Sequence, residues 1–155
     1  MPAAMLIRHA DAADLPFILS MAPRLAGVAQ LPWRNDAEIM RFQRDFMTFC
    51  LSVPGSQSLL ACAADGTRLG FIHVEPAVDS MSSETCGYVS LLAVTEDAEG
   101  KGLASALMAA AEDWAKAQGY GLLCLDVFAS NERGRAFYAR QGYAAETLRL
   151  VKPLS

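Results

Sequence analysis

The 155-residue sequence lacks the excess of positive charge that marks a nucleic-acid binder, since 13 Lys and Arg stand against 17 Asp and Glu. The formal net charge of −4 offers no general attraction for phosphate backbones. No apolar run approaches the roughly 20 residues of a membrane span, and the N-terminus has no charged region followed by an apolar stretch. We therefore expect no nucleic-acid partner, no membrane and a cytoplasmic location.

Patterns for metal binding and disulfide bonding are also missing. The four cysteines (Cys50, Cys62, Cys86 and Cys124) form no CxxC pair, and each lies in an apolar run. A reduced thiol in such a run behaves as a small hydrophobic side chain. His9 and His73 have none of the spacings of a zinc site. The sequence predicts buried thiols and no metal.

The composition is that of one ordered domain over residues 1–155. Hydrophobic residues make up 53% of the chain and charged residues 19%, which is enough for a sizeable core. Apolar periodicity and turn residues predict helices from Asp11 or Asp14 to about 26, from about 36 to 53, over 100–118 and over 132–141. They predict strands over 5–8, 57–63, 69–74, 84–94, 122–128 and 143–151.

The resulting order, β-α-α-β-β-β-α-β-α-β, argues for the α/β class with a mixed sheet and helices on both faces. In the second helix Ile39, Phe42, Phe46, Phe49 and Cys50 recur at the helical period. Glycine is expected in a four-residue hairpin connection at 64–67 and as the left-handed cap Gly119.

A turn with two glycines joins a strand to an Ala-rich helix at Val94-Thr95-Glu96-Asp97-Ala98-Glu99-Gly100-Lys101-Gly102-Leu103-Ala104. Backbone N–H groups at a helix start are unpaired, and the helix dipole adds about half a positive charge. Glycines let a diphosphate approach such an end closely. Taken alone, the same residues also describe a flexible turn that leads into a helix.

A second segment follows the next strand and reads Asn131-Glu132-Arg133-Gly134-Arg135-Ala136-Phe137-Tyr138-Ala139-Arg140-Gln141-Gly142-Tyr143. Asn131 is a suitable helix N-cap. Phe137, Tyr138 and Tyr143 suit a core. Taken alone, these residues are explained by capping and packing.

Together and in this order, the two segments resemble the GNAT superfamily of acetyl-CoA-dependent N-acetyltransferases. The family's first motif, (Gln/Arg)-x-x-Gly-x-(Gly/Ala), corresponds to residues 99–104. Its second motif corresponds to Asn131, Arg133-Gly134, Phe137-Tyr138 and Gly142-Tyr143. The resemblance implies a GNAT-like acyl-CoA N-acyltransferase fold with a mostly antiparallel sheet, and acetyl-CoA as co-substrate.

The resemblance also implies roles for individual residues in binding acetyl-CoA. The turn would hold the diphosphate through Glu99, Gly100, Lys101, Gly102, Leu103 and Ala104. The amide of Leu92 would stabilise an oxyanion, with Ala93 and Val94 pairing with the pantetheine arm. Asn131 would bind the pantetheine, and Arg133 and Arg135 would reach the 3′-phosphate.

Glu99 departs from the family pattern, because a carboxylate stands where Gln or Arg is usual. Glu96 likewise replaces a frequent Pro. A carboxylate about 4 Å from a phosphate oxygen would cost about 1 kcal/mol in water and more in a less polar site. We expect Glu99 to point to solvent or to be offset by Lys101.

Direct attack of an amine on the thioester through a tetrahedral intermediate requires a base and an acid. An amine with a pKa of about 10.4 is mostly protonated near neutral pH, so a carboxylate is needed to take its proton. Glu75 and Glu84 are the candidates, with Asp79 as a weaker third, although each can equally be an ordinary surface carboxylate. By resemblance, Tyr138 would protonate the leaving thiolate.

The acceptor is predicted to be a small-molecule amine. By resemblance, the first two helices and the loop between them would select it, and Trp33 in that loop either lines the acceptor pocket or packs in the core. Two alternatives remain open at this stage. One is a peptide or protein amine as the acceptor, and the other is a non-catalytic acyl-CoA sensor with Glu99 as its altered residue. An exposed edge strand would also permit a homodimer.

Overall fold

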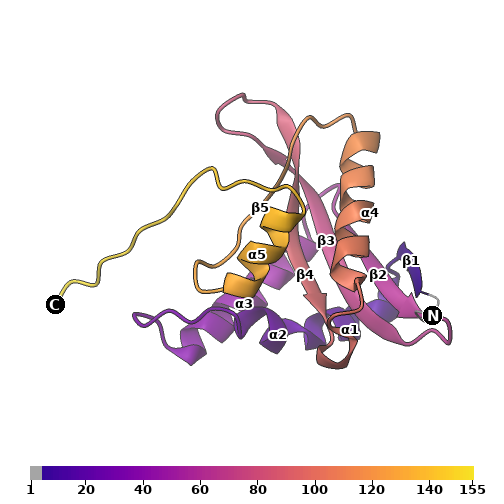
Figure 1. Ribbon diagram of the computed structural model, residues 1–155, viewed down its shortest axis with the longest axis horizontal. Coiled ribbons are helices and arrows are strands. Elements are labelled where there is room, and N and C mark those ends of the chain that lie inside the picture. The colour runs from indigo at the N-terminus through magenta and orange to yellow at the C-terminus, as the bar shows by residue number, and fades with distance from the viewer. Residues whose placement is uncertain (1–4) are drawn as a thin grey trace.

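A computed structural model describes residues 5–155, so the first four residues of the predicted domain lie outside it. The chain forms one five-stranded sheet in the order β1-β2-β3-β4-β5 (Figure 1). The strands are β1 (Met5–His9), β2 (Gln57–Ala63), β3 (Arg68–Val78), β4 (Thr85–Val94) and β5 (Leu123–Leu125). All neighbours are antiparallel except β4 and β5, which run parallel. The predicted mixed sheet is confirmed.

Helices cover both faces of this sheet. The helices are α1 (Leu15–Ser20), α2 (Ala22–Ala26), α3 (Asp36–Leu51), α4 (Leu103–Ala117) and α5 (Glu132–Arg140), with 3₁₀ turns η1 (Ala12–Asp14) and η2 (Glu96–Ala98). The first predicted helix is therefore divided at Met21. None of the helices in residues 5–155 has the length and apolar character that crossing a bilayer would require.

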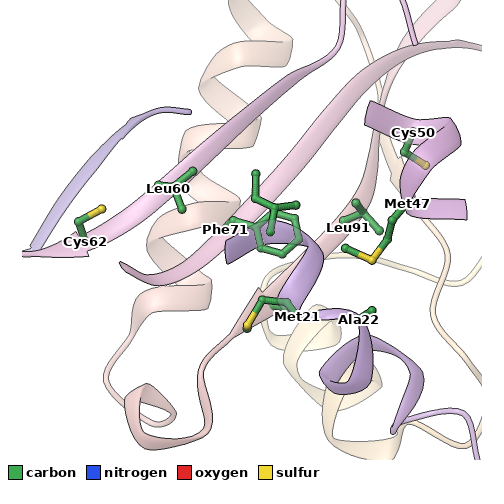
Figure 2. Packing of buried hydrophobic residues seen from close by; sticks show 10 residues of the cluster. Met21, Ala22, Met47, Cys50, Leu60, Cys62, Phe71 and Leu91 are labelled. Carbon is green, nitrogen blue, oxygen red and sulfur yellow. The ribbon is translucent and has the colours of Figure 1, made fainter. Parts of the chain in front are cut away.

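Two apolar cores lie on opposite sides of the sheet. One joins α1, α2 and α3 to the sheet, and Figure 2 shows Met47 and Met21 beside Phe71 and Leu91. The other places Leu107 and Met108 of α4 against Ile72, Val74 and Val89. Because each face has its own core, the central strands are fixed from both sides.

The first turn of the chain is fixed by a buried carboxylate. Asp11 and Asp14 form a capping box around η1. Asp14, which is fully buried, accepts two hydrogen bonds from Arg8 at 2.7 and 2.8 Å and one from Arg68 at 2.7 Å. Hydrogen bonds from Arg8 hold the Asp14 pKa well below its usual range. This network joins the start of α1 to β1 and β3.

Several local predictions are confirmed. Gly66 in the hairpin and Gly119 after α4 have φ of 89° and 81°, which confirms the glycine turns predicted at these two positions. Cys50, Cys62 and Cys86 are buried free thiols, as predicted, whereas the Cys124 thiol is only partly buried.

The predicted apolar face of α3 is only partly right. The buried stripe is Ile39, Gln43, Met47 and Cys50, whereas Phe42 and Phe49 are 51% and 64% exposed. Two stripes with helical spacing share this helix, and spacing alone does not say which one faces the sheet.

The predicted strand over 143–151 is wrong. Residues 144–155 are extended but belong to no sheet, and they leave the body of the protein (Figure 1). The predicted strand over 122–128 is shortened to β5. Strand-forming side chains need a paired neighbour to form a strand, and the tail has none within residues 5–155.

Candidate active site

The edge of β4 that faces β5 opens partway along its length. β5 pairs with β4 from Gly87 to Val89 and no further. At that point β4 contains a bulge, since His73 pairs with Leu91 and Val74 pairs with Val89, which leaves Ser90 as the extra residue. A bulge bends a strand and increases its twist. The bulge therefore marks the place where β4 and β5 separate.

Backbone amides of β4 beyond the bulge face this gap. The Thr95 N–H donates to the Leu69 carbonyl of β3 at 2.8 Å. Because N–H directions alternate along a strand, Ala93 also directs its amide to β3, where its partner is Phe71, and Leu92 and Val94 direct theirs away from it. The predicted oxyanion donor Leu92 and the predicted pantetheine contact Val94 present their amides to the gap, whereas the other predicted pantetheine contact, Ala93, does not.

The gap leads to the predicted diphosphate turn. Gly100 and Gly102 have φ of 76° and 78°, and a Cβ at either position would meet no atom within 4 Å. The first backbone hydrogen bond of α4 runs from Ala106 to Gly102, so the amides of Leu103 and Ala104 belong to the unpaired first turn. Lys101 is exposed beside them. The turn is open to solvent and rich in donors, which fits an anionic group.

Glu99 does not point freely into solvent, and Lys101 does not offset it. Its carboxylate forms ion pairs with Arg24 of α2 and with Arg133 of α5, the latter at 2.8 Å. Hydrogen bonds from Arg24 and then Arg133 lower the Glu99 pKa. Two arginines thus offset the negative charge of Glu99.

Arg24 is a site residue that the sequence reading missed. Its Nε donates to the Val94 carbonyl at 3.1 Å, so this carbonyl is not free for a ligand. The only available signal was a basic residue in the last turn of a short helix, 75 residues before Glu99. Arg135 donates a hydrogen bond to the Ala129 carbonyl at 3.2 Å.

Asn131 caps α5, as predicted. Its Oδ1 accepts a hydrogen bond from the Gly134 amide at 2.9 Å. A Cβ at Gly134 would lie 2.3 Å from the Asn131 Nδ2, so glycine is required for this cap. Because Asn131 Oδ1 accepts the capping hydrogen bond, Asn131 Nδ2 is the atom left for the predicted contact with pantetheine.

Tyr138 lies in the core on the α4 side, packed with Phe137 and Tyr143. Burial raises the pKa of Tyr138 above its ordinary value. The same core includes Leu92 and Val94 as partly buried members. Tyr138 is thus a protonated phenol in the side-chain cluster that borders the gap.

The structure separates the candidate bases. Glu75 lies on β3 opposite Tyr88, is 7% exposed, and has one carboxylate oxygen without a hydrogen-bond partner in residues 5–155. Glu84 precedes β4, eight residues from Leu92, which is about 27 Å along an extended strand. Asp79 lies in the same distal turn, where its carboxylate binds Ser82. Only Glu75 lies in the middle of the sheet, near the bulge.

His73 lies on β3 opposite Leu91 at the bulge, and its ring contacts β2 and the end of α3. Its ring bonds Ser58 Oγ at 2.6 Å and the Cys50 carbonyl at 2.8 Å, beside a hollow of about 470 Å³ that also contains His9. Both ring nitrogens are satisfied, and burial lowers the His73 pKa. These two hydrogen bonds connect the end of α3 to β2 and β3. Within residues 5–155, no group of three or more metal-ligating side chains occurs.

A family model described as acetyltransferase (GNAT) family matches residues 20–143. This range includes the bulged strand, the glycine turn and α5. The chain belongs to the acetyltransferase (GNAT) family. Family membership makes it an acyltransferase, as the two sequence motifs predict.

Relatives and solved structures agree with this family. An uncharacterized N-acetyltransferase, YhfO of Bacillus subtilis, is 29% identical over 89 residues, which span 57% of this chain and 60% of YhfO. Ribosomal-protein-alanine N-acetyltransferase of Brucella melitensis superposes with a TM-score of 0.70 at 23% identity, covering 97% of this chain and 100% of that one. The aminoglycoside N-acetyltransferase AAC(6')-Iy in complex with CoA gives 0.69 at 20%, covering 100% and 97%. At these identities the structural likeness concerns the fold.

Proposed function

We propose that this chain transfers an acetyl group from acetyl-CoA to the primary amine of a small molecule. The observation that carries the proposal is the open edge of β4, where the Leu92 and Val94 amides have no strand partner in residues 5–155 and lead to the Gly100–Gly102 turn. An extended pantetheine arm fits such an edge as an additional strand would. A diphosphate fits the unpaired amides of the turn.

The phosphate end would be held by backbone amides and cations. Amides of residues 100–104 surround the diphosphate, and Lys101 adds a mobile positive charge. Arg24 and Arg133 are held beside this turn by their ion pairs with Glu99. The donors suit a nucleotide-linked acyl carrier, and AAC(6')-Iy, of the same fold, was solved with CoA.

At the reacting end, the Leu92 amide would donate to the oxygen of the thioester carbonyl as charge develops on it. The bulge and the two cores hold this amide in place before substrate arrives. A fixed donor of this kind contributes about 3 kcal/mol of transition-state stabilisation.

Glu75 is the base in this proposal. Its buried oxygen without a partner can accept a proton from the incoming amine. Four residues of β4 separate Tyr88, its neighbour across the strands, from Leu92. That distance is about 13 Å, so one or more water molecules would relay the proton. Glu84 is too distant along β4 for the same role.

Tyr138 would protonate the departing thiolate. Its raised pKa keeps the phenol protonated at neutral pH, so the O–H can donate a hydrogen bond to the thiolate as it departs and share its proton, whereas complete transfer to a thiolate with an ordinary pKa of about 8.5 is uphill. The four free thiols fit a reducing compartment such as the cytoplasm.

Calorimetry with acetyl-CoA and with free coenzyme A tests the binding part. We expect both to bind and expect no heat from an acetyl thioester of pantetheine alone, because that compound lacks the diphosphate. Equal binding of the short thioester, or no heat from any of the three, would contradict the assignment of the turn.

Thiol release from acetyl-CoA, measured over a panel of small amines, amino sugars and N-terminal peptides, tests the chemistry. We expect a small amine to give the highest turnover. Tyr138→Phe should then lower turnover about 100-fold with little change in acetyl-CoA affinity. Tyr143→Phe is the matched control, because Tyr143 packs on Tyr138 in the same cluster. Equal activity of Tyr138→Phe would remove Tyr138 from the mechanism, and turnover with peptides alone would replace the acceptor class.

A further inference from the structure

Ser58 and His73 form a hydrogen-bonded pair that the proposed acetyl transfer does not use. They face each other across β2 and β3, and Ser58 Oγ lies 2.6 Å from His73 Nδ1. His73 Nε2 lies 2.8 Å from the carbonyl oxygen of Cys50, which can only accept a hydrogen bond. Nε2 therefore carries the proton of the neutral ring, Nδ1 is the acceptor, and the Ser58 hydroxyl donates to it.

The surroundings of the ring suit the transfer of a proton from Ser58. His73 is only 2% exposed, and burial lowers its pKa, so the ring is neutral near neutral pH and able to accept a proton. Glu75 lies two residues further along β3 on the same face of the sheet, and its charge favours the protonated ring. A nucleophile, a base and a group that orients the base are the elements of an activated serine, and the Cys50 carbonyl is the orienting group here.

This pair borders the hollow of about 470 Å³, a volume in the range of small-molecule sites. Ser58 is only partly buried, so a molecule in the hollow can reach its hydroxyl. Leu15, Ile18 and Leu51 supply apolar lining. Of the lining residues that the structure describes, only Asp11 carries a formal charge, and it is negative. The hollow therefore suits an uncharged molecule with an apolar group and disfavours a polyanion such as an acyl-CoA.

We propose that the hollow is a second catalytic site, in which Ser58 is the nucleophile and His73 the general base for the hydrolysis of small uncharged esters. Ser58 Oγ attacks the carbonyl carbon of the ester and forms a C–O bond, while His73 Nδ1 takes the hydroxyl proton. Ser56, which lines the same hollow, donates a hydrogen bond to the carbonyl oxygen as negative charge develops on it.

Collapse of this intermediate breaks the bond to the alcohol, which leaves with the proton from His73, and an acyl group remains on Ser58. Water then attacks the acyl carbon and gives a proton to His73. The bond to Ser58 Oγ breaks, Ser58 regains the proton, and the carboxylic acid departs. Ester and water are the only reactants, so the site needs neither acetyl-CoA nor an amine.

An alkyl fluorophosphonate tests the nucleophile, because a serine that attacks its phosphorus remains covalently bound while fluoride leaves. On the full chain we expect one label per chain, located on Ser58 by peptide mass spectrometry. Ser58→Ala should abolish labelling, and His73→Gln should slow it about 100-fold. Ser52→Ala is the matched control and should label as the parent chain does, because Ser52 Oγ donates to the Phe49 carbonyl at 2.7 Å instead of to an imidazole.

Release of nitrophenolate from nitrophenyl butyrate tests turnover, with circular dichroism to show that each variant is folded. We expect repeated turnover by the parent chain and a rate about 100-fold lower for Ser58→Ala. Excess coenzyme A should change neither labelling nor hydrolysis, because none of the residues assigned to the donor gap lines the hollow. An unlabelled parent chain, a label on another residue, no repeated turnover, rates that the Ser58 and His73 variants leave unchanged, or protection by coenzyme A would each overturn the proposal.

Discussion

Two regions of this protein each hold a carboxylate between two arginines, and they differ in burial. Asp14 lies between Arg8 of β1 and Arg68 of β3, with its side chain fully buried. Glu99 lies between Arg24 and Arg133 with its side chain 31% exposed, at the open end of the gap.

Burial decides what each arrangement can do. A buried carboxylate cannot lose a partner without a large cost, so the Asp14 network is structural. Exposed ion pairs contribute little to stability and exchange readily with water or another anion. The Glu99 pairs can therefore open when a phosphate arrives, which the Asp14 pairs cannot do.

The isosteric substitutions Asp14→Asn and Glu99→Gln give the strongest test of this difference between the buried and the exposed network. Asp14→Asn should lower the free energy of unfolding by about 3 kcal/mol, because it leaves two arginines around a neutral group at the start of α1. Glu99→Gln should leave the urea midpoint nearly unchanged. Equal effects of the two substitutions on urea unfolding would show that burial does not separate the two networks.

The stability of the protein should also respond to pH through His73, whose ring is buried. Its folded-state pKa is lowered by burial, so below about pH 6.5 the unfolded chain binds a proton that the folded chain does not. The free energy of unfolding should therefore fall as pH drops below 6.5, by at most about 1.4 kcal/mol per pH unit.

Thermal unfolding between pH 7.5 and 5 measures this slope. His73→Gln should flatten it, whereas His9→Gln, at an exposed position on β1, should leave it as in the parent chain. A slope that survives His73→Gln would assign the pH dependence to another group.

At the open end, Glu99→Gln should tighten acetyl-CoA binding a few-fold. The substitution removes a negative charge near the diphosphate and releases Arg24 and Arg133. Calorimetry at low and high salt checks this, since screening should shrink the gain at high salt. Weaker binding by the variant would mean that Glu99 positions the two arginines instead of competing for them.

The smallest expected difference is between the two arginines. Arg24→Gln should weaken acetyl-CoA binding more than Arg133→Gln, by about twofold. Arg24 also fixes the Val94 carbonyl, while the Arg133 side chain is 74% exposed. Dissociation constants of both variants at one salt concentration give the comparison, and the reverse order would place the phosphate nearer α5.

Local features of the fold and the site could be predicted from the sequence, whereas contacts between distant segments could not. Gly66, Gly119 and the cap at Asn131 follow from local chemistry, and the structure contains each of them. The motif residues from Gly100 to Ala104 come together because they are consecutive in the chain. Local rules suffice where the interacting groups are close in sequence.

Distant pairings did not follow from the sequence. Arg24 and Glu99 are 75 residues apart, and nothing in either segment indicates the other. The exposed Phe42 and Phe49 have the same spacing as the buried stripe of α3, so only the sheet decides between them. The tail has the residues of a strand, but a strand also needs a neighbour, which its own sequence does not supply.

Ser90, the extra residue of the β4 bulge, is an informative residue to delete. Val89 faces the α4 core and Leu91 faces the opposite core, so these two residues already alternate as if Ser90 were absent. Excising Ser90 would keep every later side chain on its present side while removing the bend. The shortened β4 would then be free to pair with the residues that follow β5, which would close the gap in which we propose that the acyl donor binds.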